Sequence, residues 1–183
     1  MGGLASRGQL RWSFGRWAAV TVPLVLLIGF ASGRLVPAGS DNPWYVALAK
    51  PPLTPPDWLF PVAWTIIYVL LGLAAATVLN ARGARGRRPA VALFVIEVVA
   101  LALWQPLFFG AHRIAAALGL IGFILAWGIA TTILFGRVRT GAAWLMVPLL
   151  VWVSFAGVLA WRIGQLNPAA ARVAPGPRTS QML

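Results

Sequence analysis

The run WLFPVAWTIIYVLLGLAAATVLN, residues 58–80, decides the fold class of this chain. Its 23 residues include no charged side chain, whereas the apolar stretch of a buried helix in a soluble domain is usually shorter. A helix of this length, rising about 1.5 Å per residue, crosses a hydrocarbon core about 30 Å thick. The run therefore predicts a transmembrane helix.

Four further apolar blocks of similar length lie before and after this run. Hydrophobic residues make up 60% of the chain and charged residues 10%, against roughly 25% charged residues in soluble domains. We therefore predict an all-α integral membrane protein, a bundle of five transmembrane helices. A signal peptide is the alternative for the first block, because a basic segment precedes it. The blocks cover residues 17–33, 90–109, 114–135 and 142–163.

The composition excludes most familiar catalytic chemistry. The chain has no Cys, one His and three acids, so thiolate sites, multi-His metal sites and paired-carboxylate mechanisms lack their components. We expect no metal site. The net charge of +12 comes from Arg residues spread between the apolar blocks, which indicates contact with anionic lipid headgroups and no nucleic-acid partner. A channel or ion-driven transporter normally needs several ionisable groups in the membrane, and only Glu97 qualifies.

Ten Trp residues form the second marked feature of the composition. Five lie near block ends, where an interfacial aromatic belt is the simplest interpretation: Trp17, Trp44, Trp58, Trp144 and Trp161. Four lie inside blocks, where their indoles need partners and can line a cavity: Trp64, Trp104, Trp127 and Trp152.

The first connection, residues 34–57, is the longest loop between blocks and is rich in Pro and aromatic residues. Because Pro fixes φ and lacks an N–H donor, we expect a stiff segment that is non-helical until Trp58. Such a segment can hold aromatic side chains over the helix ends as a rigid lid. The predicted lid residues are Trp44, Lys50, Pro51, Pro55, Pro56 and Trp58.

These residues form a pattern that resembles a known family. Residues 44–68 read W-Y-x4-K-P-x3-P-P-x-W-x-F-x3-W-T-x2-Y, and residues 104–110 read WQPLFFG. This combination is similar to the signature of the TspO/MBR family, the tryptophan-rich sensory proteins related to the mitochondrial translocator protein. The resemblance covers about residues 17–167. It leaves residues 1–16 as a basic N-terminal tail and residues 168–183 as a C-terminal tail that we expect to be disordered.

The resemblance implies a five-helix bundle whose first connection covers a pocket, with no cofactor required. It implies that the ligand is a porphyrin, such as protoporphyrin IX or a haem-like tetrapyrrole. It also favours a homodimer, and the Arg, Ala and Gly bias points to a bacterial cell membrane. The ligand-binding residues that it implies are Tyr45, Phe60, Trp64, Tyr68, Glu97, Trp104, Phe108 and Trp152.

Four positions depart from the family pattern. Leu53 stands where the first connection usually carries a Trp. Leu101 and Ala160 stand where the family usually carries Asn, and Glu97 stands in place of a Gln. The two Asn losses remove neutral hydrogen-bonding groups, so the ligand can differ from that of better-known members. Glu97 is either a hydrogen-bonded structural acid or a polar ligand contact. His112 is expected to face solvent, with haem-iron ligation as the alternative.

Three functions follow as hypotheses. The first is porphyrin binding for stress-linked regulation, sequestration or transport, with the propionates meeting Lys50, Arg34 or the helix end near Trp58. The second is a light- and oxygen-dependent enzyme that degrades porphyrin held between Trp64 and Trp152, its candidate catalytic residues. The third is a ligand-gated membrane sensor or scaffold. Small-residue spacings in residues 115–126 permit close helix contact, inside the bundle or across a dimer.

Overall fold

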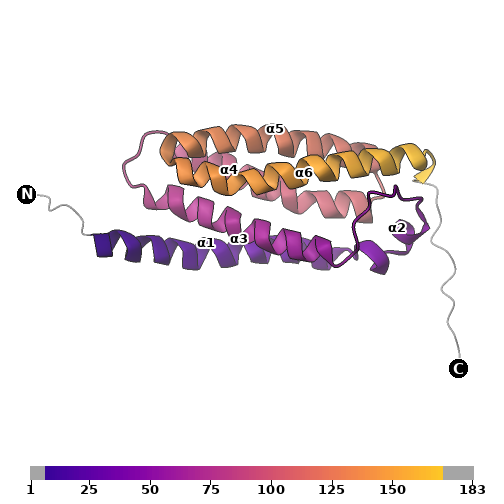
Figure 1. Ribbon diagram of the computed structural model, residues 1–183, viewed down its shortest axis with the longest axis horizontal. Helices are drawn as coiled ribbons and strands as arrows, with labels where there is room; N and C mark the ends of the chain where they lie inside the picture. The colour runs from indigo at the N-terminus through magenta and orange to yellow at the C-terminus, as the bar shows by residue number, and fades with distance from the viewer. Residues whose placement is uncertain (1–6, 171–183) are drawn as a thin grey trace, which may run out of the picture.

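Residues 7–170 are described by the computed structural model, and they are helical with short connections (Figure 1). Within this range five helices are long and apolar enough to cross a membrane, and no strand occurs. The prediction of an all-α five-helix membrane protein is therefore confirmed. The long helices are α1 (Arg7–Leu35), α3 (Leu59–Asn80), α4 (Arg87–Gln105), α5 (Ile114–Val138) and α6 (Thr140–Leu166).

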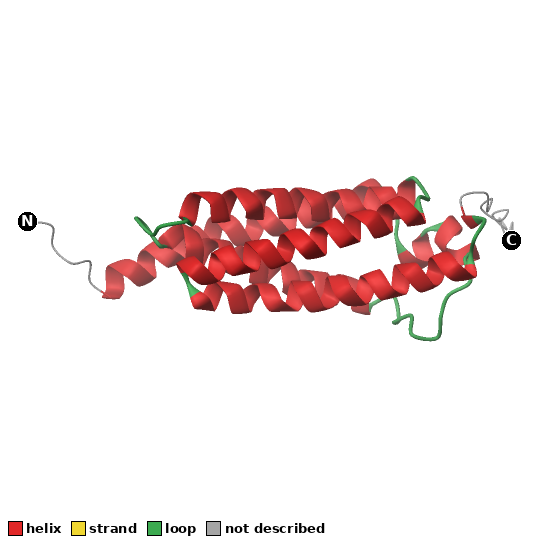
Figure 2. Cartoon of the chain, turned by 90° about the horizontal axis from the view of Figure 1, so that it is seen from above, coloured by secondary structure: helices red, strands yellow, loops and turns green. Residues whose placement is uncertain are grey.

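The five helices run nearly along one common axis (Figure 2). Helix α1 packs chiefly against α3, α5 packs chiefly against α6, and α4 contacts α5 and α1. A further contact between α3 and α6 closes the bundle. The first connection lies at one end, beside the C-terminal end of α6 (Figure 1). Residues that are far apart in the sequence therefore meet at this end.

Helices α1 and α3 approach so closely that a glycine is required at their crossing. A Cβ added to Gly72 would lie 2.5 Å from the Cα atom of Val22. The hydroxyl of Thr21 donates a hydrogen bond of 2.7 Å to the Gly72 carbonyl across the same contact. Small residues permit such backbone approach in membrane proteins, where packing and interhelical hydrogen bonds drive helix association.

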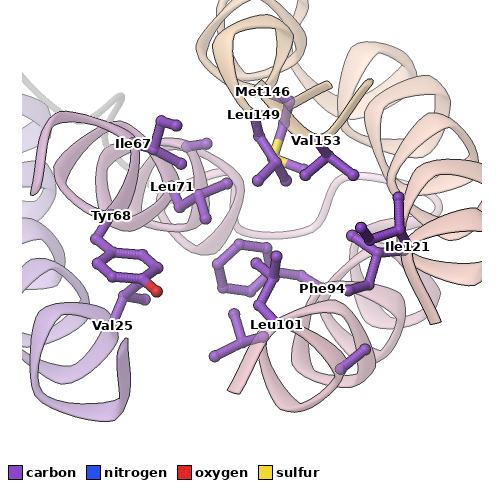
Figure 3. Close-up of a cluster of buried hydrophobic side chains, with 14 of the residues drawn as sticks. Val25, Ile67, Tyr68, Leu71, Phe94, Leu101, Ile121, Met146, Leu149 and Val153 are labelled. Atoms are coloured by element: carbon purple, nitrogen blue, oxygen red, sulfur yellow. The ribbon is translucent and has the colours of Figure 1, made fainter. Parts of the chain in front are cut away.

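The bundle interior is apolar and receives side chains from all five long helices. Figure 3 shows Leu71, Phe94, Ile121 and Met146 directed toward one another from α3, α4, α5 and α6. Between α4 and α5, the indole N–H of Trp127 donates to the Leu93 carbonyl at 3.0 Å. These contacts fix how each helix is rotated about its axis, and therefore which side chains face the interior of the bundle.

The two ends of the chain differ from their predicted boundaries. Helix α1 begins at Arg7, so residues 7–16 are helical although they were predicted as a tail. At the other end, Ala170 is buried and its carbonyl accepts a hydrogen bond of 2.8 Å from the Trp44 indole. The disorder predicted from residue 168 is therefore wrong for residues 168–170. Residues 171–183 lie outside the described residues.

The first connection contains helical turns where none was predicted. A 3-10 turn, η1 (Gly39–Asp41), precedes a short helix, α2 (Pro43–Ala47). Asn42 caps α2, because its side-chain oxygen accepts a hydrogen bond of 3.0 Å from the Tyr45 N–H. Pro43 occupies the first helical position, where its missing N–H costs nothing. The cap and the proline together explain the helix.

Candidate ligand-binding cavity

A cavity of about 340 Å³ lies at the end of the bundle that carries the first connection. Its walls come from α1, α3, α4, α6, the first connection and the turn that follows α4. Eight aromatic side chains line it: Phe30, Tyr45, Phe60, Trp64, Tyr68, Trp104, Phe108 and Phe109. The volume lies near the lower limit of ordinary small-molecule sites, which are roughly 300–1,000 Å³.

Helix α3 presents one stacked aromatic pair to the cavity. The rings of Trp64 and Tyr68 lie 5.2 Å apart at 27°, because residues four positions apart share one face of a helix. Phe30 of α1 meets Tyr68 edge-on at 6.0 Å. Gly29 leaves room for the Tyr68 ring, since an added Cβ would overlap it. The α1–α3 contact thus positions this wall.

A π-helical turn, η2 (Pro106–Gly110), carries the opposite aromatic wall. Pro106 lacks an N–H group and so interrupts the α-helical hydrogen bonds, and its own carbonyl accepts from the Ala111 N–H at 2.9 Å, five residues on, which makes the turn wider. Phe108 and Phe109 both reach the cavity from this turn. Trp104 stacks on Phe108 at 5.1 Å and completes the wall.

Trp152 was predicted as a ligand contact but does not line the cavity. It packs edge-on against Trp64 at 6.5 Å and against Phe60 at 5.9 Å. Because the two indoles are in direct edge-to-face contact, no macrocycle fits between them. Trp152 instead packs behind Trp64 and Phe60, the two aromatic side chains that line the cavity.

Glu97 also lies outside the cavity. Its side chain is fully buried beside Gly128 of α5 and Leu150 of α6. Neither carboxyl oxygen has a hydrogen-bond partner among residues 7–170. That Glu97 contacts a ligand therefore stays a prediction, and the structural alternative lacks, among residues 7–170, the hydrogen bonds that it assumed.

The two positions that lost Asn differ in their environment. Ala160 lines the cavity from α6, together with Ala156 and Leu159. Leu101 is buried in the core and does not line the cavity. The α6 wall is consequently apolar, and of the two positions where the resemblance implies Asn only Ala160 lies at the cavity.

The lid is held down by contacts with the C-terminal end of α6 and with η2. Asn167 bonds both backbone groups of Ala49, at 2.9 and 2.8 Å. Trp44 is 1% exposed and stacks on His112 with ring centroids 4.4 Å apart. The predicted belt position of Trp44 is therefore wrong, whereas His112 is half-buried, with one ring face against Trp44.

Most predicted lid residues support the cavity without lining it. The ammonium group of Lys50 bonds the carbonyls of Val46 and Leu48, each at 3.2 Å, and lies 4.8 Å from the Tyr45 ring. Pro51 is buried, whereas Trp58 is 64% exposed. Pro55 and Pro56 shape the segment that leads to α3 without reaching the cavity. Lys50 thus stabilises the local structure of the lid and does not line the cavity.

Two carboxylates that the sequence analysis did not select line the cavity, Asp41 and Asp57. Asp57 accepts a hydrogen bond of 2.9 Å from the Ser40 N–H, which ties the two ends of the lid together. The available sequence signal was that two of only three acids lie within the first connection. Other lining residues missed by the sequence analysis are Gly29, Phe30, Gly33, Gln105, Phe109, Ala156, Leu159 and Ile163.

Comparison with known proteins gives a consistent match over most of the chain. Residues 19–166 match the TspO/MBR family. Tryptophan-rich protein TspO of Chlorobaculum tepidum is 39% identical over 153 residues, which cover 82% of this chain and 95% of that protein. Protein CrtK of Rhodobacter capsulatus is 38% identical over 134 residues, 70% and 81% of the two chains. Translocator protein of Bos taurus is 31% identical over 153 residues, 81% and 89% of the two chains.

Proposed function

The chain belongs to the TspO/MBR family, and on this premise we propose that it binds a porphyrin in the aromatic cavity beneath the first connection. The protein is an integral multi-pass membrane protein, and its bacterial relatives agree with a bacterial cell membrane. The observation that carries the proposal is the set of eight aromatic rings around one cavity.

The physical support is the match between flat aromatic walls and a flat macrocycle. Stacked and edge-on aromatic pairs contribute about 0.5–1.5 kcal/mol each beyond the burial of apolar area. Trp64 and Tyr68 offer one such wall, and Trp104 and Phe108 offer another. Apolar α6 side chains cover a further side. A planar conjugated ring system therefore gains more from this cavity than a polar or strongly branched ligand does.

We propose that binding serves stress-linked regulation, sequestration or transport of tetrapyrroles. The relatives carry the names "Tryptophan-rich sensory protein" and "Translocator protein", which describe sensing and translocation for those proteins. In this chain the two hydrogen bonds between Asn167 and Ala49 hold the lid over the cavity. Ligand entry past the lid would require these bonds to open.

The test is quenching of Trp fluorescence by protoporphyrin IX in nanodiscs. Trp64→Phe removes a cavity-lining indole, whereas Trp144→Phe removes an exposed indole of α6 that does not line the cavity. We expect saturable quenching by the parent and at least a fivefold weaker affinity for Trp64→Phe, with Trp144→Phe unchanged. Absence of saturable quenching, or equal affinities for both variants, would contradict the proposal.

A second candidate function is oxidative degradation of the bound porphyrin by light and dioxygen. The observation in its favour is the contact between Trp64, which lines the cavity, and Trp152 behind it at 6.5 Å. Aerobic illumination of the complex should then produce a new chromophore that Trp64→Phe and Trp152→Phe each suppress. Photobleaching at the same rate in the double variant would exclude a role for these indoles.

We further propose a homodimer formed through the outer face of α5. Ala115, Gly119, Gly122 and Ala126 are exposed or half-buried there, and a Cβ added at either glycine would meet no atom within 4 Å. The small residues therefore do not serve contacts inside the bundle, which leaves the dimer alternative. Gly122→Leu should abolish crosslinked dimers, whereas Gly15→Leu, at an exposed glycine of α1, should not. Persistence of dimers in Gly122→Leu would exclude this face.

A further inference from the structure

We propose that Asp41 and Asp57 make the cavity selective by charge, so that it favours flat aromatic ligands whose polar group at the lid is neutral or cationic. The inference rests on the proposed function and names the class of ligand within it. It replaces the expectation that Lys50 and Arg34 receive porphyrin propionates at this site. A porphyrin with free carboxylates would then bind less tightly than the same ring system with neutral side chains.

The first step is the placement of the acids. The chain contains 15 basic and three acidic residues, and two of those three acids line this one cavity. Asp57 is fixed by the Ser40 N–H at 2.9 Å. The η1 turn that carries Asp41 lies against it, since a Cβ at Gly39 would be 3.3 Å from the Asp57 carboxyl carbon. Two negative charges therefore lie on the same side of the cavity.

The second step is that no cation lines the cavity to offset these charges. Within residues 7–170, no Lys or Arg belongs to the cavity wall. Lys50 is bound to two backbone carbonyls and the face of Tyr45. Arg34 is exposed and is not part of the wall. Lys50 and Arg34 therefore do not lie where they could pair with propionates. The third candidate, the helix end near Trp58, does lie at the cavity, but its Leu59 and Phe60 N–H groups already donate to the carbonyls of Pro56 and Asp57.

The third step concerns neutral donors, which could otherwise stabilise a carboxylate. The amide N–H of Gln105 is directed to the carbonyls of Gly33 and Val36, at 3.4 and 3.0 Å. The phenols of Tyr45 and Tyr68 belong to the wall, but a phenol O–H can donate to an ester carbonyl as well as to a carboxylate. The indole N–H of Trp104 also belongs to the wall and is buried without a partner among residues 7–170, and it too can donate to an ester or to a carboxylate. All these donors are neutral, so they do not offset the charge of the two acids. Binding sites often contain a charge of the same sign as that of an unwanted ligand, because the repulsion lowers the affinity for that ligand.

The effect should be moderate because both acids are exposed. Charges that stay in contact with water interact weakly even when they are a few ångströms apart, and salt screens them over about 10 Å at 0.1 M. We therefore expect a preference of about three- to tenfold at low salt, decreasing as salt is added. The aromatic walls supply affinity, and the acids supply discrimination among ligands of the same shape.

The experiment compares three porphyrins on the parent protein in nanodiscs of neutral lipid. The probes are protoporphyrin IX, its dimethyl ester, and a derivative with amine side chains, each titrated at low and high salt. The test variant combines Asp41→Asn with Asp57→Asn, and the amide introduced by Asp57→Asn keeps an oxygen for the Ser40 N–H. Asp41→Asn alone is the second variant, and Glu97→Gln, which alters the third acid outside the cavity, is the matched control.

The deciding quantity is the ratio of affinities for ester over diacid, compared between parent and variants, because partitioning into lipid then cancels. We expect this ratio to fall at least threefold in the double variant, to fall less in Asp41→Asn, and to stay unchanged in Glu97→Gln. An unchanged ratio in the double variant would overturn the charge selectivity while leaving porphyrin binding intact. Absence of saturable binding by all three probes would overturn the proposed function itself.

Discussion

Gly72→Ala is the substitution for which the structure makes the sharpest prediction. The added methyl group would lie 2.5 Å from the Cα atom and 2.9 Å from the backbone nitrogen of Val22. Neither atom belongs to a flexible side chain, so α1 must move away from α3. The hydrogen bond of 2.7 Å from Thr21 to the Gly72 carbonyl lengthens in the same movement.

The magnitude follows from these two contacts. Overpacking of a close contact costs about 1–3 kcal/mol, and a lost hydrogen bond costs about 0.5–1.5 kcal/mol. We therefore expect Gly72→Ala to lower the free energy of unfolding by about 2–4 kcal/mol. Because α1 also contributes Gly29, Phe30 and Gly33 to the cavity, the separation should weaken porphyrin binding as well.

The assay is reversible unfolding of purified protein in mixed micelles, followed by circular dichroism as the denaturing detergent is increased. The matched control is Gly15→Ala in α1, where an added Cβ would meet no atom within 4 Å. This control should be neutral or more stable by up to about 1 kcal/mol, since Ala favours a helix over Gly. Equal unfolding transitions for Gly72→Ala and the parent would refute the close α1–α3 approach.

Three further predictions concern the core, the lid and the aromatic wall. Glu97→Met should raise the free energy of unfolding by about 1–3 kcal/mol, because it removes a buried carboxyl without partners among residues 7–170. Thr131→Val is the control, because the buried hydroxyl that it removes is already bonded at 2.9 Å. This control should not stabilise the protein in the same unfolding assay. Asn167→Ala breaks the hydrogen bonds that hold the lid, so hydrogen exchange in residues 38–50 should accelerate. Gly29→Ala displaces the Tyr68 ring and should weaken porphyrin binding at least fivefold; unchanged affinity would argue against this wall.

The fold was predictable because each transmembrane helix satisfies its backbone hydrogen bonds within its own segment. Residues 58–80 therefore identify a helix without knowledge of its neighbours, and the observed helix α3 begins one residue later. The ends of the spans were less predictable. Helix α1 extends to Arg7, beyond the apolar block. Hydropathy indicates which residues lie in the hydrocarbon core, so it does not locate the end of a helix that continues outside the membrane.

The candidate site was predictable in part. Six of the eight residues implied as ligand contacts line one cavity: Tyr45, Phe60, Trp64, Tyr68, Trp104 and Phe108. Trp152 and Glu97 do not. Trp152 is four residues from Ala156, and Glu97 is seven residues from Trp104, so each shares a helix face with a residue that lines the cavity. The difference therefore concerns depth along the helix axis. The depth at which the cavity ends is set by interhelical contacts such as Gly128 with Glu97 and Trp64 with Trp152.

The sequence by itself determined the membrane class, the number of spanning helices and the aromatic motif at one end of the bundle. Those properties are local, since a segment of about 20 apolar residues meets lipid whatever surrounds it. Only the tertiary structure decided which aromatic rings face the cavity and which charges lie at the lid. The path of the first connection places Asp57 at the cavity and ties Lys50 to backbone carbonyls. Contacts as distant in sequence as Asn167 with Ala49 hold that path in place, and no local pattern specifies them.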